Sequence, residues 1–262
     1  MDTGLSNRVA LVNGASQGIG KAIALGLSKE GAIVCLTARN KPRLAQTADE
    51  IHQITGNRVV YLAADVVRPE SASEVIHFVR ENIGNIDILI NNSGGPKFGT
   101  LMNLNETDWD QALQLSLLSS IRFTKEVIPS MLEKTWGRII NVTSTVAKEP
   151  SPTMILSATA RAGLAAFSKA LSIELAPSGI TVNTICPGGV LTERLHNLLE
   201  VRSQTEHIPY ETLLKQSEKS IPIGRFASPE EFSEIIIFLC SERANYVTGT
   251  YISVDGGLTK SL

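Results

Sequence analysis

This sequence contains few cysteines, histidines and aromatic side chains, and its net charge is small. Its 262 residues include three cysteines, Cys35, Cys186 and Cys240, and all three lie inside apolar runs. This spacing suits neither a metal cluster nor a disulfide framework, so we expect buried, reduced thiols, no metal site and a reducing compartment. The formal net charge is −2 and there is no basic block, which argues against a nucleic-acid partner.

Long hydrophobic runs are also missing. No apolar stretch reaches the length of a membrane span, and the chain opens with Met1-Asp2-Thr3-Gly4 rather than with the apolar core of a signal peptide. We therefore expect a soluble cytoplasmic protein with no membrane partner. A hydrophobic content of 43% still supports a substantial core. Together with the length, it predicts a single domain that covers residues 1–262.

Short apolar runs alternate along the chain with longer amphipathic segments. The runs predict strands at 9–12, 33–37, 59–63, 86–90, 138–142, 181–185 and 251–254. The amphipathic segments predict helices at 21–29, 43–54, 72–81, 109–132, 163–175 and 229–239. Because the strands are apolar at nearly every position, we expect an α/β doubly wound (Rossmann) domain, with a parallel sheet of about seven strands and helices on both faces. The polar segment 191–222 fits either a helical lid over a pocket or an exposed pair of surface helices.

A glycine-rich turn, Asn13-Gly14-Ala15-Ser16-Gln17-Gly18-Ile19-Gly20, follows the first predicted strand. Glycines let the backbone approach a pyrophosphate, and the N-terminus of the next helix adds partial positive charge, although glycine also serves helix packing. The second strand ends in Thr37-Ala38-Arg39-Asn40, without the acid that binds the ribose 2′-hydroxyl of NAD. Arg39 can pair with a 2′-phosphate instead, which favours NADP(H) over NAD(H). The alternative is a solvated arginine at a helix start.

These segments, with Asn91-Asn92-Ser93-Gly94 and Pro187-Gly188, resemble the short-chain dehydrogenase/reductase family over nearly the whole chain. Within that family the sequence looks like the 3-oxoacyl-acyl-carrier-protein reductases. The resemblance implies an NADP(H)-dependent oxidoreductase acting on a small carbonyl or alcohol substrate. It also implies a homo-oligomer, a dimer or tetramer, paired through the helices near 109–132 and 154–175. The cofactor-binding residues that it implies are Gly14, Ser16, Gln17, Gly18, Ile19, Gly20, Arg39, Asp65, Val66, Asn91, Ser93, Gly94, Arg161, Pro187, Gly188, Val190 and Thr192.

The catalytic tetrad of the family is largely missing. The family places a tyrosine thirteen residues after its catalytic serine and a lysine four residues after that; counting from Ser144 gives Ser157 and Arg161. The family's helix asparagine aligns with Ser116, so Ser144 alone of the four is retained. A serine hydroxyl is shorter than a phenol and a far weaker acid, and a guanidinium cannot shuttle a proton. We expect the proton relay of the family to be lost, while Arg161 can still hold a ribose or phosphate.

Three functions remain open at this point. The first is an NADP(H)-dependent reductase or dehydrogenase whose proton donor is displaced or is water. The second is an NADP(H)-binding sensor or regulatory subunit without redox turnover. The third is a lyase resembling halohydrin dehalogenases, which also replace the lysine by arginine but keep the tyrosine and lack the glycine-rich turn. Substitute proton donors are Tyr210, His196 and His207 in the 191–222 segment and Lys97 and Lys148 near the pocket, whereas Tyr61, Tyr246 and Tyr251 are expected to lie away from it.

Overall fold

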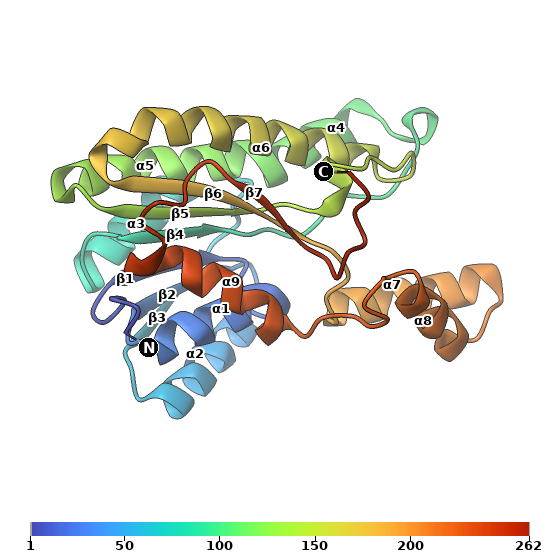
Figure 1. The fold of residues 1–262 in the computed structure, drawn as a ribbon, viewed down its shortest axis with the longest axis horizontal. Coiled ribbons are helices and arrows are strands. Elements are labelled where there is room, and N and C mark those ends of the chain that lie inside the picture. Colours follow the sequence, from blue (N-terminus) through green and yellow to red (C-terminus); the bar gives the residue numbers. More distant parts are fainter. Residues whose placement is uncertain (1, 262) are drawn as a thin grey trace.

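The computed structural model describes residues 2–261, and these residues form a seven-stranded parallel sheet between two layers of helices (Figure 1). The strand order is β3-β2-β1-β4-β5-β6-β7, as expected for a doubly wound sheet. The strands are β1 (Val9–Asn13), β2 (Ile33–Ala38), β3 (Val59–Ala63), β4 (Ile88–Asn91), β5 (Gly137–Val142), β6 (Ile180–Pro187) and β7 (Tyr251–Val254). The order reverses beside β1 and β4, which places a ligand crevice at their carboxyl ends.

The helices pack in two layers around this sheet (Figure 1). One layer consists of α1 (Gly18–Lys29), α2 (Lys41–Thr55) and α9 (Pro229–Cys240). The other consists of α3 (Ser71–Asn82), α4 (Glu106–Leu113), α5 (Ser119–Lys134) and α6 (Ile155–Leu175). Short helical turns complete the chain: η1 (Leu101–Asn103), η3 (Thr145–Ala147), η4 (Ala176–Ser178) and η5 (Glu242–Ala244). Each layer has its own hydrophobic core against one face of the sheet, which confirms the fold class predicted from the apolar pattern.

The long helix predicted at 109–132 is interrupted. A π-helical turn, η2 (Gln114–Leu118), separates α4 from α5. The chain is nevertheless helical from Glu106 to Lys134, so the predicted helix is present, and the π turn adds one residue to it. The amphipathic pattern placed the start of α6 eight residues too late, because the helix begins at Ile155, close to the start of the 154–175 helix that the resemblance implies.

The segment predicted as a lid or a surface pair forms two helices, α7 (Glu193–Glu206) and α8 (Tyr210–Lys219). They project from the main body of the molecule in Figure 1, with few contacts to the sheet layers. Thr192 caps α7 by accepting a hydrogen bond from the amide of Leu195 at 3.3 Å. Between residues 2 and 261, no helix is long and apolar enough to cross a membrane.

Candidate functional site

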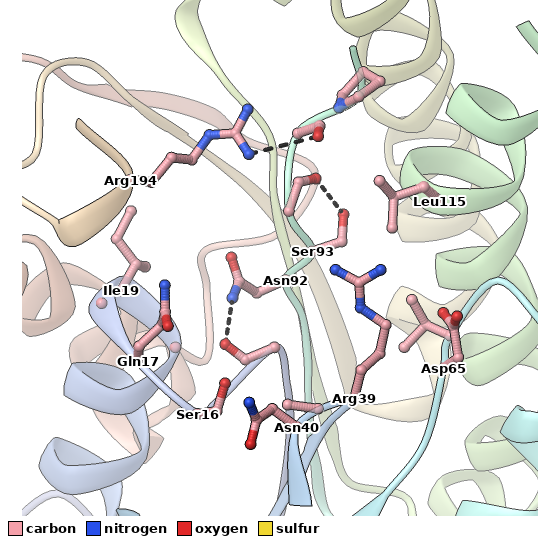
Figure 2. Close-up of a pocket in the computed structure, with 18 of the residues that line it drawn as sticks. Ser16, Gln17, Ile19, Arg39, Asn40, Asp65, Asn92, Ser93, Leu115 and Arg194 are labelled. Atoms are coloured by element: carbon pink, nitrogen blue, oxygen red, sulfur yellow. Dashed lines mark hydrogen bonds between the residues drawn. The ribbon is translucent and has the colours of Figure 1, made fainter. Parts of the chain in front are cut away.

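A cavity of about 550 Å³ lies along the carboxyl ends of β1, β2, β3 and β4 (Figure 2). Most of the predicted cofactor-binding residues line it. They are Gly14, Ser16, Gln17, Gly18, Ile19, Gly20, Arg39, Asp65, Val66, Ser93, Gly94 and Thr192. The structure thus brings together five chain segments that the sequence places up to about 180 residues apart. We call this space the dinucleotide cavity.

The glycines of the first turn are required by close backbone contacts. A Cβ atom on Gly20 would lie 2.2 Å from the carbonyl oxygen of Gly14, and Gly14 itself has a φ of 64°. Asn92 holds the turn from the other side, because its Nδ2 donates to the carbonyl oxygens of Asn13 and Gly14 at 3.2 and 3.3 Å (Figure 2). This cradle leaves the N-terminus of α1 open to a phosphate group, as a dinucleotide requires.

Two arginines stand at the end of the dinucleotide cavity nearest β2. Arg39 extends its exposed side chain into the cavity (Figure 2), and it takes part in no ion pair between residues 2 and 261. Arg43, in the first turn of α2, also lines the cavity and was not predicted. It donates to Gln17 Oε1 and forms an ion pair with Glu193 at 2.8 Å. No sequence pattern marks it, because Arg39 precedes the N-cap Asn40 and the two arginines share no helical spacing.

A second cavity, of about 210 Å³, adjoins the first near β5, β6 and α6. We call it the inner cavity. Ser144, Ser157 and Arg161 all line it, together with the predicted residues Pro187, Gly188, Val190 and Thr192. Ser157 and Arg161 lie on one face of α6, one turn apart, and Ser144 approaches from the end of β5. The retained serine and the two replaced residues therefore meet at one place, as the alignment predicted.

Arg161 is 7% exposed and is held by backbone carbonyls. Its Nη1 donates to the carbonyl oxygens of Val142 and Thr143 at 3.2 and 2.6 Å, and its Nη2 donates to Gly94 at 3.3 Å. Burial, and then the positive charge of Arg194, lower the pKa of Arg161 to about 10. The guanidinium therefore stays charged at neutral pH, and the described residues that line the inner cavity include no tyrosine, histidine or lysine.

Two predicted residues do not reach either cavity. Asn91 is 3% exposed and belongs to a buried network, in which its Nδ2 donates to Asn141 Oδ1 at 2.8 Å and its Oδ1 accepts from Asn13 at 3.4 Å. The neighbouring residue Asn92 lines the cavities in its place. Ser116 is 2% exposed in the π turn η2, and its Oγ has no hydrogen-bond partner among the described residues.

Tyr251, one of three tyrosines expected to lie away from the pocket, lines neither cavity but lies near Arg161. Tyr251 begins β7, and its hydroxyl accepts a hydrogen bond from Cys186 Sγ at 3.3 Å. Burial raises the pKa of this phenol, and its ring lies under the Lys148 ammonium, 4.9 Å from the ring centroid. The charge of Tyr251 also influences Arg161, and Tyr251 is paired with Thr184 of β6 in the sheet.

The other candidate proton donors are engaged elsewhere. The hydroxyl of Tyr210 lies 2.5 Å from Nδ1 of His196, joining α8 to α7, and neither residue lines a cavity. His207 ends α7 with a φ of 54°. Lys97 borders the dinucleotide cavity and is paired with Asp108 at 3.0 Å.

Comparison with known proteins agrees with this geometry. Residues 14–259 match the family model described as enoyl-(acyl carrier protein) reductase. The chain is 33% identical to the 3-oxoacyl-[acyl-carrier-protein] reductase of Aquifex aeolicus, over 98% of this chain and 100% of the relative. It is 34% identical to the D-beta-hydroxybutyrate dehydrogenase of Cupriavidus necator, over 97% and 98% of the two chains.

Solved structures give the same result. The crystal structure of L-sorbose reductase from Gluconobacter frateurii, complexed with NADPH and L-sorbose, superimposes with a TM-score of 0.96 at 36% identity and covers 100% of both chains. An actinorhodin polyketide ketoreductase with NADPH superimposes with a TM-score of 0.93 at 34% identity, over 97% and 98% of the chains. The sequence match, the strand order and the glycine cradle agree over the whole domain, and the chain belongs to the short-chain dehydrogenase/reductase family.

Proposed function

We propose that this chain binds NADP(H) in preference to NAD(H) and reduces the carbonyl group of a small molecule, with water as the proton source. The observation that carries the proposal is the inner cavity, where a buried guanidinium and two serine hydroxyls stand in place of the family's phenol and lysine. The relatives that act on 3-oxoacyl groups, hydroxybutyrate and sorbose support carbonyl chemistry at this site.

The preference for NADP(H) rests on Arg39 and Arg43. Both side chains border the end of the dinucleotide cavity near β2, and no acidic residue of β2 is present to bind a free ribose hydroxyl. A 2′-phosphate would receive charge-assisted hydrogen bonds from one or both guanidinium groups. The carboxylate of Glu193, now paired with Arg43, is the group that such a phosphate would displace or share.

The inner cavity can stabilise the product of hydride addition. Bound NADPH would supply a hydride to the carbonyl carbon of the substrate, and the carbonyl oxygen would then carry the negative charge of an alkoxide. The Arg161 guanidinium and the hydroxyls of Ser144 and Ser157 can donate hydrogen bonds to that oxygen as its charge develops. Water then protonates the alkoxide, whose basicity is close to that of hydroxide, and no positioned acid is required.

The reverse reaction lacks a necessary group. An alcohol must lose its proton as hydride leaves, and a positioned base usually accepts it. The described residues that line the inner cavity include no histidine, lysine, tyrosine or carboxylate. By microscopic reversibility, hydroxide would be the base for alcohol oxidation, so that reaction should accelerate as the pH rises.

Stopped-flow and steady-state measurement of NADPH oxidation tests this proposal. A panel of 3-oxoacyl thioesters, acetoacetate and ketoses should include a substrate that is reduced above background, with a rate that changes little between about pH 6 and 9 because no lining group titrates there. The reduction of NADP⁺ by the corresponding alcohols should instead rise with pH, because hydroxide is the base in that direction. A rate of ketone reduction that depends strongly on pH would contradict the assignment of water as the proton source.

The replacement of three tetrad residues also supports a second candidate, an NADP(H)-binding regulatory protein without turnover. Calorimetry separates the two. Tight NADPH binding with no oxidation on any member of the panel supports the regulatory function, and absence of NADPH binding contradicts both.

A further inference from the structure

Arg161 is a buried cation without a counter-ion. It forms no ion pair with any residue between 2 and 261, and its three hydrogen bonds go to neutral backbone carbonyls. Its Nε–H has no acceptor. Carbonyl dipoles solvate a guanidinium, but they do not neutralise its charge, and buried arginines ordinarily have an anionic partner. The molecule therefore carries the cost of an unneutralised charge beside a cavity.

A second positive charge faces the same space. Arg194, in the first turn of α7, lines both cavities, and its closest acceptor is the carbonyl oxygen of Gly95 at 3.5 Å (Figure 2). The charge of Arg194 lowers the pKa of Arg161, so the two guanidinium groups repel each other. An anion between them would remove this repulsion and supply the missing counter-charge.

The walls of the inner cavity suit a small organic anion that has a charged group at one end and a short carbon chain at the other. Arg161 and Arg194 are the charged side chains among the described residues that line it, and both are positive. Ser144 and Ser157 add hydroxyl donors, while Met154, Leu195 and Leu198 form an apolar wall. The volume of about 210 Å³ limits the ligand to a short chain when the nicotinamide end of a cofactor shares the space.

The phosphates of a dinucleotide do not account for Arg161. Arg194 borders the dinucleotide cavity and can approach a pyrophosphate. Arg161 does not border the dinucleotide cavity and lines only the inner cavity. The ribose that the family's lysine would bind is neutral. The counter-ion of Arg161 must therefore come from a different ligand.

We propose that the inner cavity binds the carboxylate of a short oxo acid, with that carboxylate between Arg161 and Arg194 and the short carbon chain against Met154 and Leu198. This inference rests on the proposed function, since it names the substrate class of the same site: a 2-oxo or 3-oxo carboxylic acid rather than a neutral ketone. Its carbonyl oxygen would lie next to the carboxylate, within the group formed by Arg161, Ser144 and Ser157.

Binding to the NADP⁺ complex tests the inference without turnover, because oxidised cofactor cannot reduce a ketone. Isothermal titration calorimetry would compare acetoacetate with its neutral methyl ester, and acetate with chloride. We expect the acid to bind about 10- to 100-fold more tightly than the ester, the range for a charge-assisted hydrogen bond. Equal binding of acid and ester, or equal binding of acetate and chloride, would overturn the carboxylate assignment.

Three variants locate the site. Arg194→Met changes an exposed side chain and should weaken acetoacetate binding about tenfold or more while the protein stays folded. Ser157→Phe fills the inner cavity and leaves both arginines in place, so it should abolish binding. Arg80→Met, which removes an exposed charge on α3, is the matched control and should bind like the unmodified protein. Undiminished binding in both Arg194→Met and Ser157→Phe would refute the site.

NADPH titration of the same samples separates this inference from the proposed function. If NADPH fails to bind but acetoacetate binds in the apo protein and responds to the variants, the proposed function fails and the carboxylate site stands. If NADPH binds and a neutral ketone is reduced as efficiently as acetoacetate, the carboxylate site fails and the proposed function stands.

Discussion

Restoring the three missing side chains together should restore fast catalysis. The variant Ser116→Asn, Ser157→Tyr, Arg161→Lys rebuilds the family's tetrad around Ser144. The inner cavity of about 210 Å³, which Ser157 borders, has room for a phenol ring. Ser116, which aligns with the family's asparagine, lies in a π turn. The substitutions therefore require no rearrangement of the backbone.

The size of the gain follows from the chemistry that is missing. A positioned general acid contributes about 10²- to 10⁴-fold to a rate, which corresponds to roughly 3–5 kcal/mol of transition-state stabilisation. The cost is structural. Lysine cannot reproduce the three hydrogen bonds that Arg161 donates to Val142, Thr143 and Gly94, and each buried carbonyl left without a donor costs about 1–3 kcal/mol. We expect a lower melting temperature together with a higher kcat.

Steady-state NADPH oxidation, with the fraction of folded protein checked by circular dichroism, measures the outcome. The restored variant should gain about 10²- to 10⁴-fold in kcat, oxidise alcohols with NADP⁺, and show a titrating group in its pH profile. The matched control replaces Ser157 by Phe in the same triple variant, which fills the cavity without a hydroxyl and should show no gain. A folded, NADPH-binding triple variant with the turnover of the unmodified chain would refute the reasoning.

Three further outcomes are expected. Arg39→Gln should reduce the ratio of NADPH to NADH affinity about 10- to 100-fold, measured by fluorescence titration. Gly20→Ala places a Cβ 2.2 Å from the Gly14 carbonyl oxygen and should lower the free energy of unfolding by about 1–3 kcal/mol, seen in urea titrations together with weaker NADPH binding. Arg225 and the Ser228 amide lower the pKa of Glu231 from 4.5 to about 2. Its stabilising effect is therefore complete above pH 4.5 and lost as the pH falls toward 2, so the difference in melting temperature from Glu231→Gln should shrink over that range; a constant difference would contradict it.

The strands could be predicted from sequence because each is a short apolar run bounded by turn residues. The strands at 59–63 and 251–254 have the predicted bounds, and the others differ by a few residues. The predicted site residues that follow strands lie together along one cavity, since parallel strands bring their carboxyl ends to one edge. Asn91 is the exception: it is the last residue of β4, and its side chain turns into the buried network with Asn13 and Asn141.

What the sequence did not reveal depends on contacts between distant segments. Arg43 and Arg194 lie on helices, in polar stretches that look like ordinary surface, and only the packing of α2 and α7 brings them to the cavities. The proximity of Tyr251 to Arg161 depends in the same way on the register between β6 and β7. A local pattern cannot specify such positions, because each is fixed by two or more elements at once.

The π turn η2 is a backbone feature of the site that its side chains do not explain. A π turn adds a residue to a helix at some cost, and such turns usually persist because the displaced residue has a task. Here the displaced residue is Ser116, whose buried hydroxyl bonds to nothing among the described residues. Because π turns occur frequently at functional sites, position 116 belongs to the functional site by its backbone, although its present side chain forms no described hydrogen bond.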